Sequence, residues 1–225
     1  MDTDAAASTG PTRKPLQGRS KASYERMLAA AEKLLAATGS DEFTLTQVSR
    51  LGKVSIGSIY CRFDSKEELL RDVQVRMLAR VDARQQQAVE QAVAQARGLH
   101  ELVGLLVDAF AETLRSEAPL MRTFMARSTR DPEVAARGKA SYFATENAFA
   151  AALLRYREDI PQPDPERAAF AVFRIAYSTL ARYLGLGFGP AADSDGVEWT
   201  GLKQDLVDVC SAYLHYPPVR ESAAS

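Results

Sequence analysis

Apolar residues recur along nearly the whole chain at the spacing of an α-helix. Between residues 24 and 35, for example, Tyr24, Leu28, Ala31 and Leu35 fall on one face. No stretch of useful length alternates apolar and polar residues as a half-buried strand would. The pattern predicts an all-α protein of about nine helices, placed roughly at 20–38, 44–51, 55–62, 65–97, 99–118, 120–129, 132–157, 165–186 and 199–214.

Local side-chain chemistry sets the ends of the second predicted helix. Residues 44–47 read Thr-Leu-Thr-Gln, a capping box in which the Thr44 hydroxyl and the Gln47 side chain satisfy each other's free backbone amides. A tight turn at Gly52 and Lys53 ends the helix. The side chains expected to face inward are Leu45, Val48 and Leu51.

The third predicted helix has only about two turns and an unusual composition. Ile59 gives it an inward anchor, whereas its other side is made of small residues and one isoleucine. Two helices joined by such a turn form a helix-turn-helix, whose second helix enters the major groove of DNA. Serine hydroxyls can donate to or accept from bases there, and Ile56 can touch a thymine methyl group. Gly57 costs an isolated helix about 1 kcal/mol relative to Ala, which indicates a role beyond folding.

Lys66 opens the fourth predicted helix, directly after the capping residue Ser65. A cation at this end opposes the helix macrodipole by about 0.3–1 kcal/mol. A bound DNA phosphate would reverse the sign, because the lysine, the free amides and the dipole would all attract one anion. The alternative is that Glu67 and Glu68 offset Lys66 in water.

The stretch from Phe43 to Leu70, FTLTQVSRLGKVSIGSIYCRFDSKEELL, resembles the DNA-binding signature of the TetR family of bacterial transcriptional regulators. The family usually has Gly at the position of Lys53, and here Gly52 is expected to close the turn instead. The resemblance implies a helical C-terminal regulatory and dimerisation domain. It also implies phosphate contacts from Thr44, Tyr60 and Lys66, base contacts from Ser55, Ile56, Gly57 and Ser58, and a core position for Phe63.

The predicted organisation has four parts: a disordered basic arm (1–19), a helix-turn-helix DNA-binding domain (20–66), a helical regulatory and dimerisation domain (67–217) and a disordered tail (218–225). The charge distribution agrees with this division. Residues 13 to 66 hold ten basic and five acidic residues, a charge of +5, so the remainder carries −6 in a chain of net charge −1. A basic end on an acidic body is expected if that end meets DNA, although a chance distribution of solvated charges explains this feature equally well.

Aromatic and long apolar residues of the C-terminal part are candidates for the wall of a ligand cavity. Such residues at helical spacing are more often plain core, so each one alone favours a packing role. Arg174 stands out because its sequence neighbours are apolar, and a buried arginine needs a partner: a ligand anion, Glu146, Asp108 or a partner subunit. The candidate residues for a small, mainly apolar ligand are Phe110, Phe124, Met125, Tyr142, Arg174 and Tyr177.

The helices predicted at 165–186 and 199–214 carry more apolar surface than one core can use, which indicates a partner surface. One short recognition helix reads few base pairs, so a symmetric pair on a palindrome is expected. We therefore predict a homodimer held by a four-helix bundle with two helices from each subunit. The predicted interface residues are Leu180, Leu184, Leu206, Val207, Cys210 and Leu214.

The sequence offers no pattern for catalysis. His100 and His215 lack metal-binding partners at ligand spacing, and no catalytic set or phosphate-binding loop stands out, so we expect no metal, no cofactor and no enzyme. Cys61 and Cys210 show no redox spacing, and the chain has neither a signal peptide nor an apolar run of membrane length. We therefore expect a cytoplasmic protein without membrane contact.

The favoured hypothesis is a homodimeric transcriptional repressor that binds a palindromic DNA operator and is released by a small ligand. The fourth helix would transmit the signal, since it begins at Lys66 and continues into the C-terminal domain. The alternative is a constitutive or architectural DNA-binding regulator of the same fold with a solid, ligand-free core.

Overall fold

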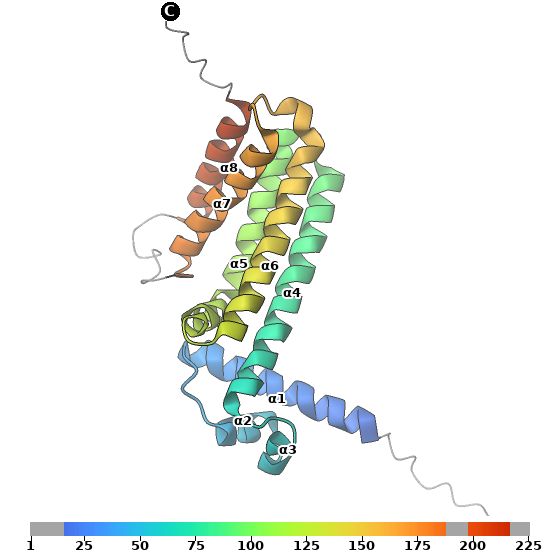
Figure 1. Cartoon of the computed structure of the whole chain (residues 1–225), viewed down its shortest axis with the longest axis vertical. Helices are drawn as coiled ribbons and strands as arrows, with labels where there is room; N and C mark the ends of the chain where they lie inside the picture. Colours follow the sequence, from blue (N-terminus) through green and yellow to red (C-terminus); the bar gives the residue numbers. More distant parts are fainter. Residues whose placement is uncertain (1–15, 188–197, 217–225) are drawn as a thin grey trace, which may run out of the picture.

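The structure is a computed structural model that describes residues 16–187 and 198–216 (Figure 1). Over these residues the chain is all-helical, which confirms the predicted fold class. The helices are α1 (Leu16–Thr38), α2 (Leu45–Gly52), α3 (Ile56–Tyr60), α4 (Lys66–Gln95), α5 (Leu99–Ser128), α6 (Pro132–Leu153), the 3₁₀ helix η1 (Leu154–Asp159), α7 (Pro165–Tyr183) and α8 (Trp199–His215). Most of the predicted arm, part of the loop before α8 and the predicted tail lie outside the described residues.

Figure 1 shows α1, α2 and α3 at one end of the molecule and an upright bundle of α5, α6, α7 and α8 above them. The long helix α4 runs from beside α2 and α3 into the bundle, where it packs against α5 and α6. A single continuous helix therefore links the two ends.

Two clusters of buried side chains hold the chain together. The bundle core lies between α5, α6, α7 and α8 and includes Leu102, Phe110, Phe149, Phe173, Leu206 and Leu214. The basal core lies around α1 and the start of α4 and includes Met27, Leu28, Ile59, Phe63, Leu69, Val73, Met77, Leu120, Phe124 and Val134. Because the basal core takes residues from α5 and α6, it crosses the domain boundary predicted at residues 66 and 67.

The turn between α2 and α3 closes differently from the prediction. Thr44 and Gln47 form the expected capping box at the start of α2. At its other end Gly52 is helical, and Lys53 takes the left-handed conformation, with φ 50° and ψ 48°. Gly52 is needed for packing instead, because a Cβ there would lie 3.0 Å from the carbonyl oxygen of Arg26 in α1.

Two smaller differences concern α1 and α2. Helix α1 begins at Leu16 rather than at Ser20, so residues 16–19 of the predicted disordered arm are helical. Leu51, predicted to face inward, is 46% exposed. Val48 and Gly52 are buried four residues apart on the side of α2 that faces α1, and this orientation turns Leu51 to solvent.

Helix α5 continues through Pro119, where the sequence predicted a break between two helices. Proline removes one backbone hydrogen bond and bends a helix, and in Figure 1 the last turns of α5 are seen nearly end-on. Leu120 and Phe124, just beyond the proline, are buried in the basal core. This packing offsets the lost hydrogen bond, so the predicted helices at 99–118 and 120–129 are one bent helix.

Candidate DNA-binding surface and ligand cavity

The exposed side of α3 carries the residues predicted to meet DNA. Ile59 is fully buried and fixes the helix on the basal core. On the other side Ile56 is exposed and Tyr60 is 59% exposed. A Cβ added to Gly57 would meet no atom within 4 Å. The fold therefore does not require glycine at this position.

Three hydroxyls predicted to contact DNA already have partners within the chain. The Ser55 hydroxyl caps α3 by accepting from the Ser58 amide at 3.1 Å, and the two serine hydroxyls lie 2.7 Å apart. The Thr44 hydroxyl accepts from the Gln47 amide at 3.2 Å. These contacts fix the hydroxyls at the surface and leave each of the three residues exposed.

Lys66 has a structural role that the sequence did not predict. Its Nζ donates to the carbonyl oxygen of Asp41 at 2.6 Å and to that of Phe43 at 3.2 Å. The ammonium thus holds the loop before α2 against the start of α4. These two carbonyls compensate the unfavourable macrodipole position, and a DNA phosphate is not needed to explain the residue.

The same loop is tied to the end of α5 by ion pairs. The Asp41 carboxylate accepts from Arg127 at 2.7 Å and from Arg130 at 2.6 Å. Burial by itself raises the pKa of Asp41, but the hydrogen bonds from the two arginines outweigh it, so the pKa is lowered overall. We call Asp41, Lys66, Arg127 and Arg130 the Asp41 cluster, and it joins the DNA-binding end to the bundle.

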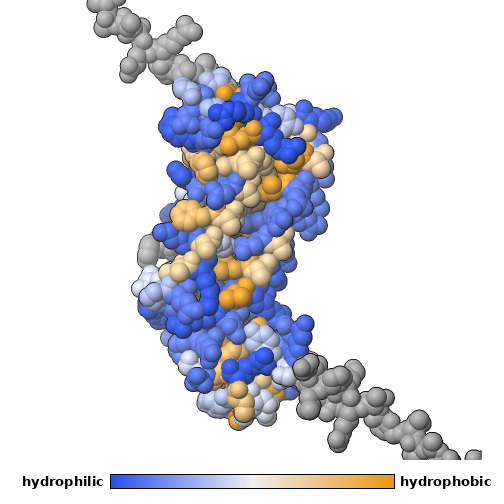
Figure 2. Space-filling view, turned by 45° about the vertical axis from the view of Figure 1, so that its right-hand side comes forward, coloured by the Kyte–Doolittle hydropathy of each residue, from blue (hydrophilic) through white to orange (hydrophobic). Residues whose placement is uncertain are grey.

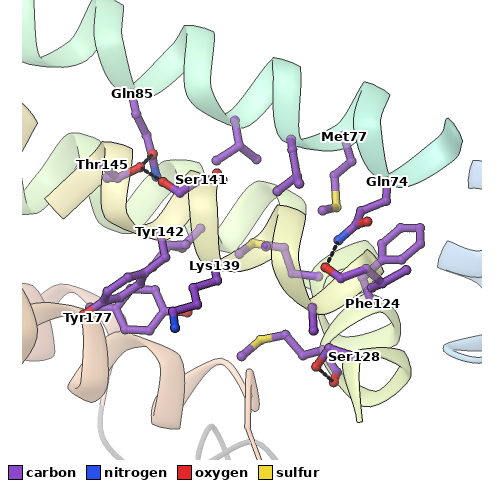
Figure 3. Close-up of a pocket in the computed structure, with 18 of the residues that line it drawn as sticks. Gln74, Met77, Gln85, Phe124, Ser128, Lys139, Ser141, Tyr142, Thr145 and Tyr177 are labelled. Carbon is purple, nitrogen blue, oxygen red and sulfur yellow. Dashed lines mark hydrogen bonds between the residues drawn. The ribbon is translucent and has the colours of Figure 1, made fainter. Parts of the chain in front are cut away.

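A cavity of about 280 Å³ lies between α4, α5, α6 and α7 (Figure 3). Its wall is mainly apolar, with Met77 and Val81 from α4 and Leu114 and Met121 from α5. Five of the six predicted ligand residues line it, namely Phe110, Phe124, Met125, Tyr142 and Tyr177. The structure thus brings together residues that lie far apart in the sequence.

Arg174 is the exception among the predicted ligand residues. Its side chain is 61% exposed, and its Nε donates to Glu146 at 2.7 Å. The arginine is not buried as predicted, because it lies on the solvent side of α7. Its partner is Glu146, one of the candidates considered, and Arg174 does not belong to the described lining of the cavity.

Apart from Tyr142, sequence reasoning missed the residues that α6 contributes to the wall. Ala135 and Gly138 are small residues three positions apart, and they leave space between α6 and α4. Lys139 and Thr145 also line the cavity. The spacing of small residues on one face of α6 was a readable signal, whereas the contribution of Lys139 depends on how α6 is rotated in the bundle.

Most of the predicted dimer residues are buried within the chain itself. Leu180, Leu184, Leu206, Cys210 and Leu214 belong to the bundle core, and Val207 packs partly against it. The exposed apolar residues of the last two helices are Ile175 on α7 and Val209 on α8, the latter 54% exposed. Figure 2 also shows an apolar strip that crosses the helical bundle between hydrophilic areas. An interface formed by α7 and α8 would therefore need side chains beyond those predicted, of which only Val207 is partly exposed.

Within residues 16–187 and 198–216, every helix is too short or too polar to span a lipid bilayer. A helix-turn-helix joined to a helical bundle that holds a cavity is the architecture of one class of proteins, DNA-binding transcriptional regulators with a separate C-terminal domain. Residues 27–73 match the profile of bacterial regulatory proteins of the tetR family, and residues 98–214 match the tetracyclin repressor-like C-terminal domain. The chain belongs to the TetR family of transcriptional regulators.

Solved structures agree with this assignment. A TetR-family regulator from Mesorhizobium loti MAFF303099 matches with a TM-score of 0.69 and 18% identity, over 87% of this chain and 96% of its own. A transcriptional regulator from Rhodococcus sp. Rha1 matches with a TM-score of 0.63 and 18% identity, over 87% of this chain and 99% of its own. The TetR-family regulator PfmR from Thermus thermophilus matches with a TM-score of 0.56 and 21% identity, over 87% of this chain and 100% of its own. At these identities the structures show the shared fold alone. A search among curated protein sequences gives no significant match.

Proposed function

We propose that this protein is a cytoplasmic, homodimeric repressor that binds a palindromic operator and leaves it when a small, mainly apolar ligand enters the cavity. One observation carries the proposal: α4 begins beside the DNA-binding surface at Lys66 and forms a wall of the cavity from Gln74 to Gln85. A rigid helix that touches both sites can convert a packing change at one into a displacement at the other.

The cavity favours this proposal over a constitutive regulator with a solid core. A space of about 280 Å³ lies close to the lower end of the usual size of small-molecule sites, about 300–1,000 Å³. Its wall combines apolar side chains with a few polar groups such as Gln85 and Thr145, which are hydrogen-bonded to each other. This composition is typical of a ligand site.

The cavity and the DNA-binding surface are connected by a second route besides α4. Phe124 lines the cavity and also belongs to the basal core that holds the helix-turn-helix. One turn further along α5, Arg127 binds Asp41 in the loop before α2. A ligand that displaces the end of α5 would therefore shift this loop. A coupling of about 1–3 kcal/mol, or five- to 150-fold in DNA affinity, is typical of such linkage.

Dimerisation is proposed through the exposed faces of α7 and α8. Ile175 and Val209 supply apolar contacts there, and the neighbouring α6 exposes Phe143 and several alanines. A symmetric pair would place two α3 helices on successive major grooves, about 34–36 Å apart or a multiple of this distance.

The DNA-binding part of the proposal is tested with Gly57→Ala. Because a Cβ at this position meets open space, alanine should raise the free energy of unfolding by about 0.5–1 kcal/mol. If α3 approaches base edges, the added methyl group should lower affinity about tenfold or more for duplexes selected from a random pool by the wild-type protein. Affinity is measured by fluorescence anisotropy, and stability by urea unfolding.

Gly104→Ala is the matched control. Gly104 lies within α5, far from α3, and a Cβ there would make an ordinary contact of 3.9 Å with Val207. This variant should be stabilised to a similar degree and bind DNA like the wild type. If Gly57→Ala binds the selected duplexes as tightly as Gly104→Ala, α3 does not approach the bases. If the wild-type protein selects no duplex at all, the proposed function is wrong.

A further inference from the structure

The polar side chains at the mouth of the cavity can all donate hydrogen bonds. Lys139 lines the cavity and is also exposed, so it marks the opening to solvent. Beside it lie Tyr142, on the same face of α6, and Tyr177 of α7 (Figure 3). The ring centroids of the two tyrosines are 4.9 Å apart. Burial raises the pKa of both tyrosines, so each phenol keeps its proton at neutral pH. Within residues 16–187 and 198–216 neither hydroxyl has a hydrogen-bond partner.

The charge at this opening is positive and unpaired within the described part of the chain. Lys139 is the one charged side chain among the described residues of the lining, and its Nζ lies 5.6 Å from the centre of the exposed Phe143 ring. Of the two nearby carboxylates, Glu146 is paired with an arginine, whereas Asp82 accepts from a neutral serine hydroxyl and keeps its charge. Glu146 accepts from Arg174 at 2.7 Å, and Asp82 accepts from Ser141 at 2.5 Å. An anion at the opening would therefore meet a free ammonium group.

The rest of the cavity is elongated and mainly apolar, and its other polar lining residues are Gln74, Gln85, Ser128, Ser141 and Thr145. The lining residues of α4 extend from Gln74 to Gln85, about 16 Å along the helix at 1.5 Å per residue. Met77 and Phe124, which are both buried, lie on the side of the cavity opposite Tyr142 and Tyr177 (Figure 3). An apolar cavity of about 150 Å³ accommodates benzene. The present volume of about 280 Å³ therefore suits a ligand with about twice as many non-hydrogen atoms.

We infer that the ligand is an elongated amphipathic anion. Its carboxylate lies at Lys139, Tyr142 and Tyr177, and its apolar chain extends between α4 and α5 toward Met77 and Phe124. This inference rests on the proposed ligand-responsive function and names the ligand class for that cavity. The anion keeps part of its hydration at the opening, so the cost of burying a charge is small, while the apolar chain supplies most of the affinity.

The test is direct calorimetric titration of the full-length protein, without DNA, with decanoate, 1-decanol and decylamine. These probes share one chain length and differ in their head groups. Decanoate should bind more tightly than 1-decanol, and decylamine should bind most weakly. Lys139→Gln should weaken decanoate binding about three- to fivefold, the effect of a partly exposed charge pair, and leave 1-decanol binding unchanged. Lys139→Arg, which keeps the charge, should bind decanoate like the wild type.

Several outcomes would overturn the inference. These are equal binding of decanoate and 1-decanol by the wild type, tightest binding of decylamine, no binding of any probe, or a Lys139→Gln variant that binds decanoate normally. Failure of the proposed function has a different signature, because decanoate would then bind the protein and leave its complex with the selected duplex intact.

Discussion

Lys53 holds a backbone conformation that glycine adopts more easily, and four residues later Gly57 occupies a helical position that does not need glycine. The first residue closes the turn of the helix-turn-helix, and the second lies on its exposed helix. Each departs from the local preference of its site, and such departures are expected where function competes with stability. A substitution at Lys53 therefore tests backbone strain, and a substitution at Gly57 tests DNA recognition.

We predict that Lys53→Gly raises the free energy of unfolding by about 0.5–1 kcal/mol. The left-handed conformation costs a non-glycine residue about 1–2 kcal/mol, and the greater freedom of glycine in the unfolded chain cancels part of the gain. Gly39→Lys is the reverse exchange at the end of α1, where φ is +65° and the surroundings are open, and it should lower stability by a similar amount. Urea unfolding measures both. A destabilised Lys53→Gly would show that the lysine side chain itself supports the turn.

We predict that Asp41→Asn lowers the free energy of unfolding by about 1–3 kcal/mol at pH 7, because its contacts with the buried Arg127 and the exposed Arg130 are weakened. The folded pKa of Asp41 is lowered. Its contribution to stability is therefore complete above the unfolded value of about 3.9 and is lost as the pH falls through the folded pKa. The difference between variant and wild type should shrink below about pH 4. A difference that stays constant down to pH 3 would contradict this assignment.

For single residues, sequence reasoning succeeded where the interacting residues are neighbours along the chain and failed where the contact depends on tertiary structure. The capping box at Thr44 depends on residues three positions apart and was predicted correctly. The partners of Lys66 lie more than twenty residues away along the chain, so no local pattern could indicate them. The position of Arg174 depends on which side of α7 meets the bundle, and apolar sequence neighbours did not determine it.

At the scale of the elements, apolar periodicity predicted most helices. It did not predict how these helices pack against one another. Helix α5 continues through Pro119 because the basal core receives the side chains beyond the bend. The apolar faces of α7 and α8 were both visible in the sequence. Periodicity does not tell an inward face from an outward one when both are apolar, and the side predicted for the dimer interface packs within the chain.

We predict that Phe110→Trp blocks ligand binding and leaves DNA binding intact. Phe110 packs against Phe173 and Tyr177 and also lines the cavity, so the larger indole ring can extend into empty space. The change in stability should stay below about 1.5 kcal/mol, since it avoids the overpacking of a solid core. The measurements are decanoate titration, affinity for the selected duplex and urea unfolding. A loss of stability of several kcal/mol would show that no usable space exists beside Phe110.

At the scale of the whole molecule, the proposed dimer uses the exposed apolar side chains of α7 and α8. We predict that Ile175→Arg and Val209→Arg give monomers that bind the selected duplex at least tenfold more weakly, because each subunit alone holds one half-site. Sedimentation velocity measures the assembly. Both side chains are exposed, so these monomers should remain folded.

Leu206→Ala provides the contrast to these variants. Leu206 is buried in the bundle core, so its truncation should lower stability by about 2–5 kcal/mol while the dimer still forms. If both arginine variants sediment as dimers, the interface lies on another face, and the exposed side of α6 with Phe143 is the next to test.

The Asp41 cluster has a consequence for how ionic strength acts on this protein. Added salt weakens protein–DNA affinity because bound counterions are no longer released into dilute solution. The same ions screen the ion pair of Asp41 with Arg130, whose side chain is 64% exposed, more than its pair with the buried Arg127 of α5, and so loosen the connection that holds the recognition helix in place. A salt titration of operator affinity would then report both effects, and a count of phosphate contacts taken from its slope would be too high. In Asp41→Asn the second effect is largely absent, so the slope of that variant gives the better count.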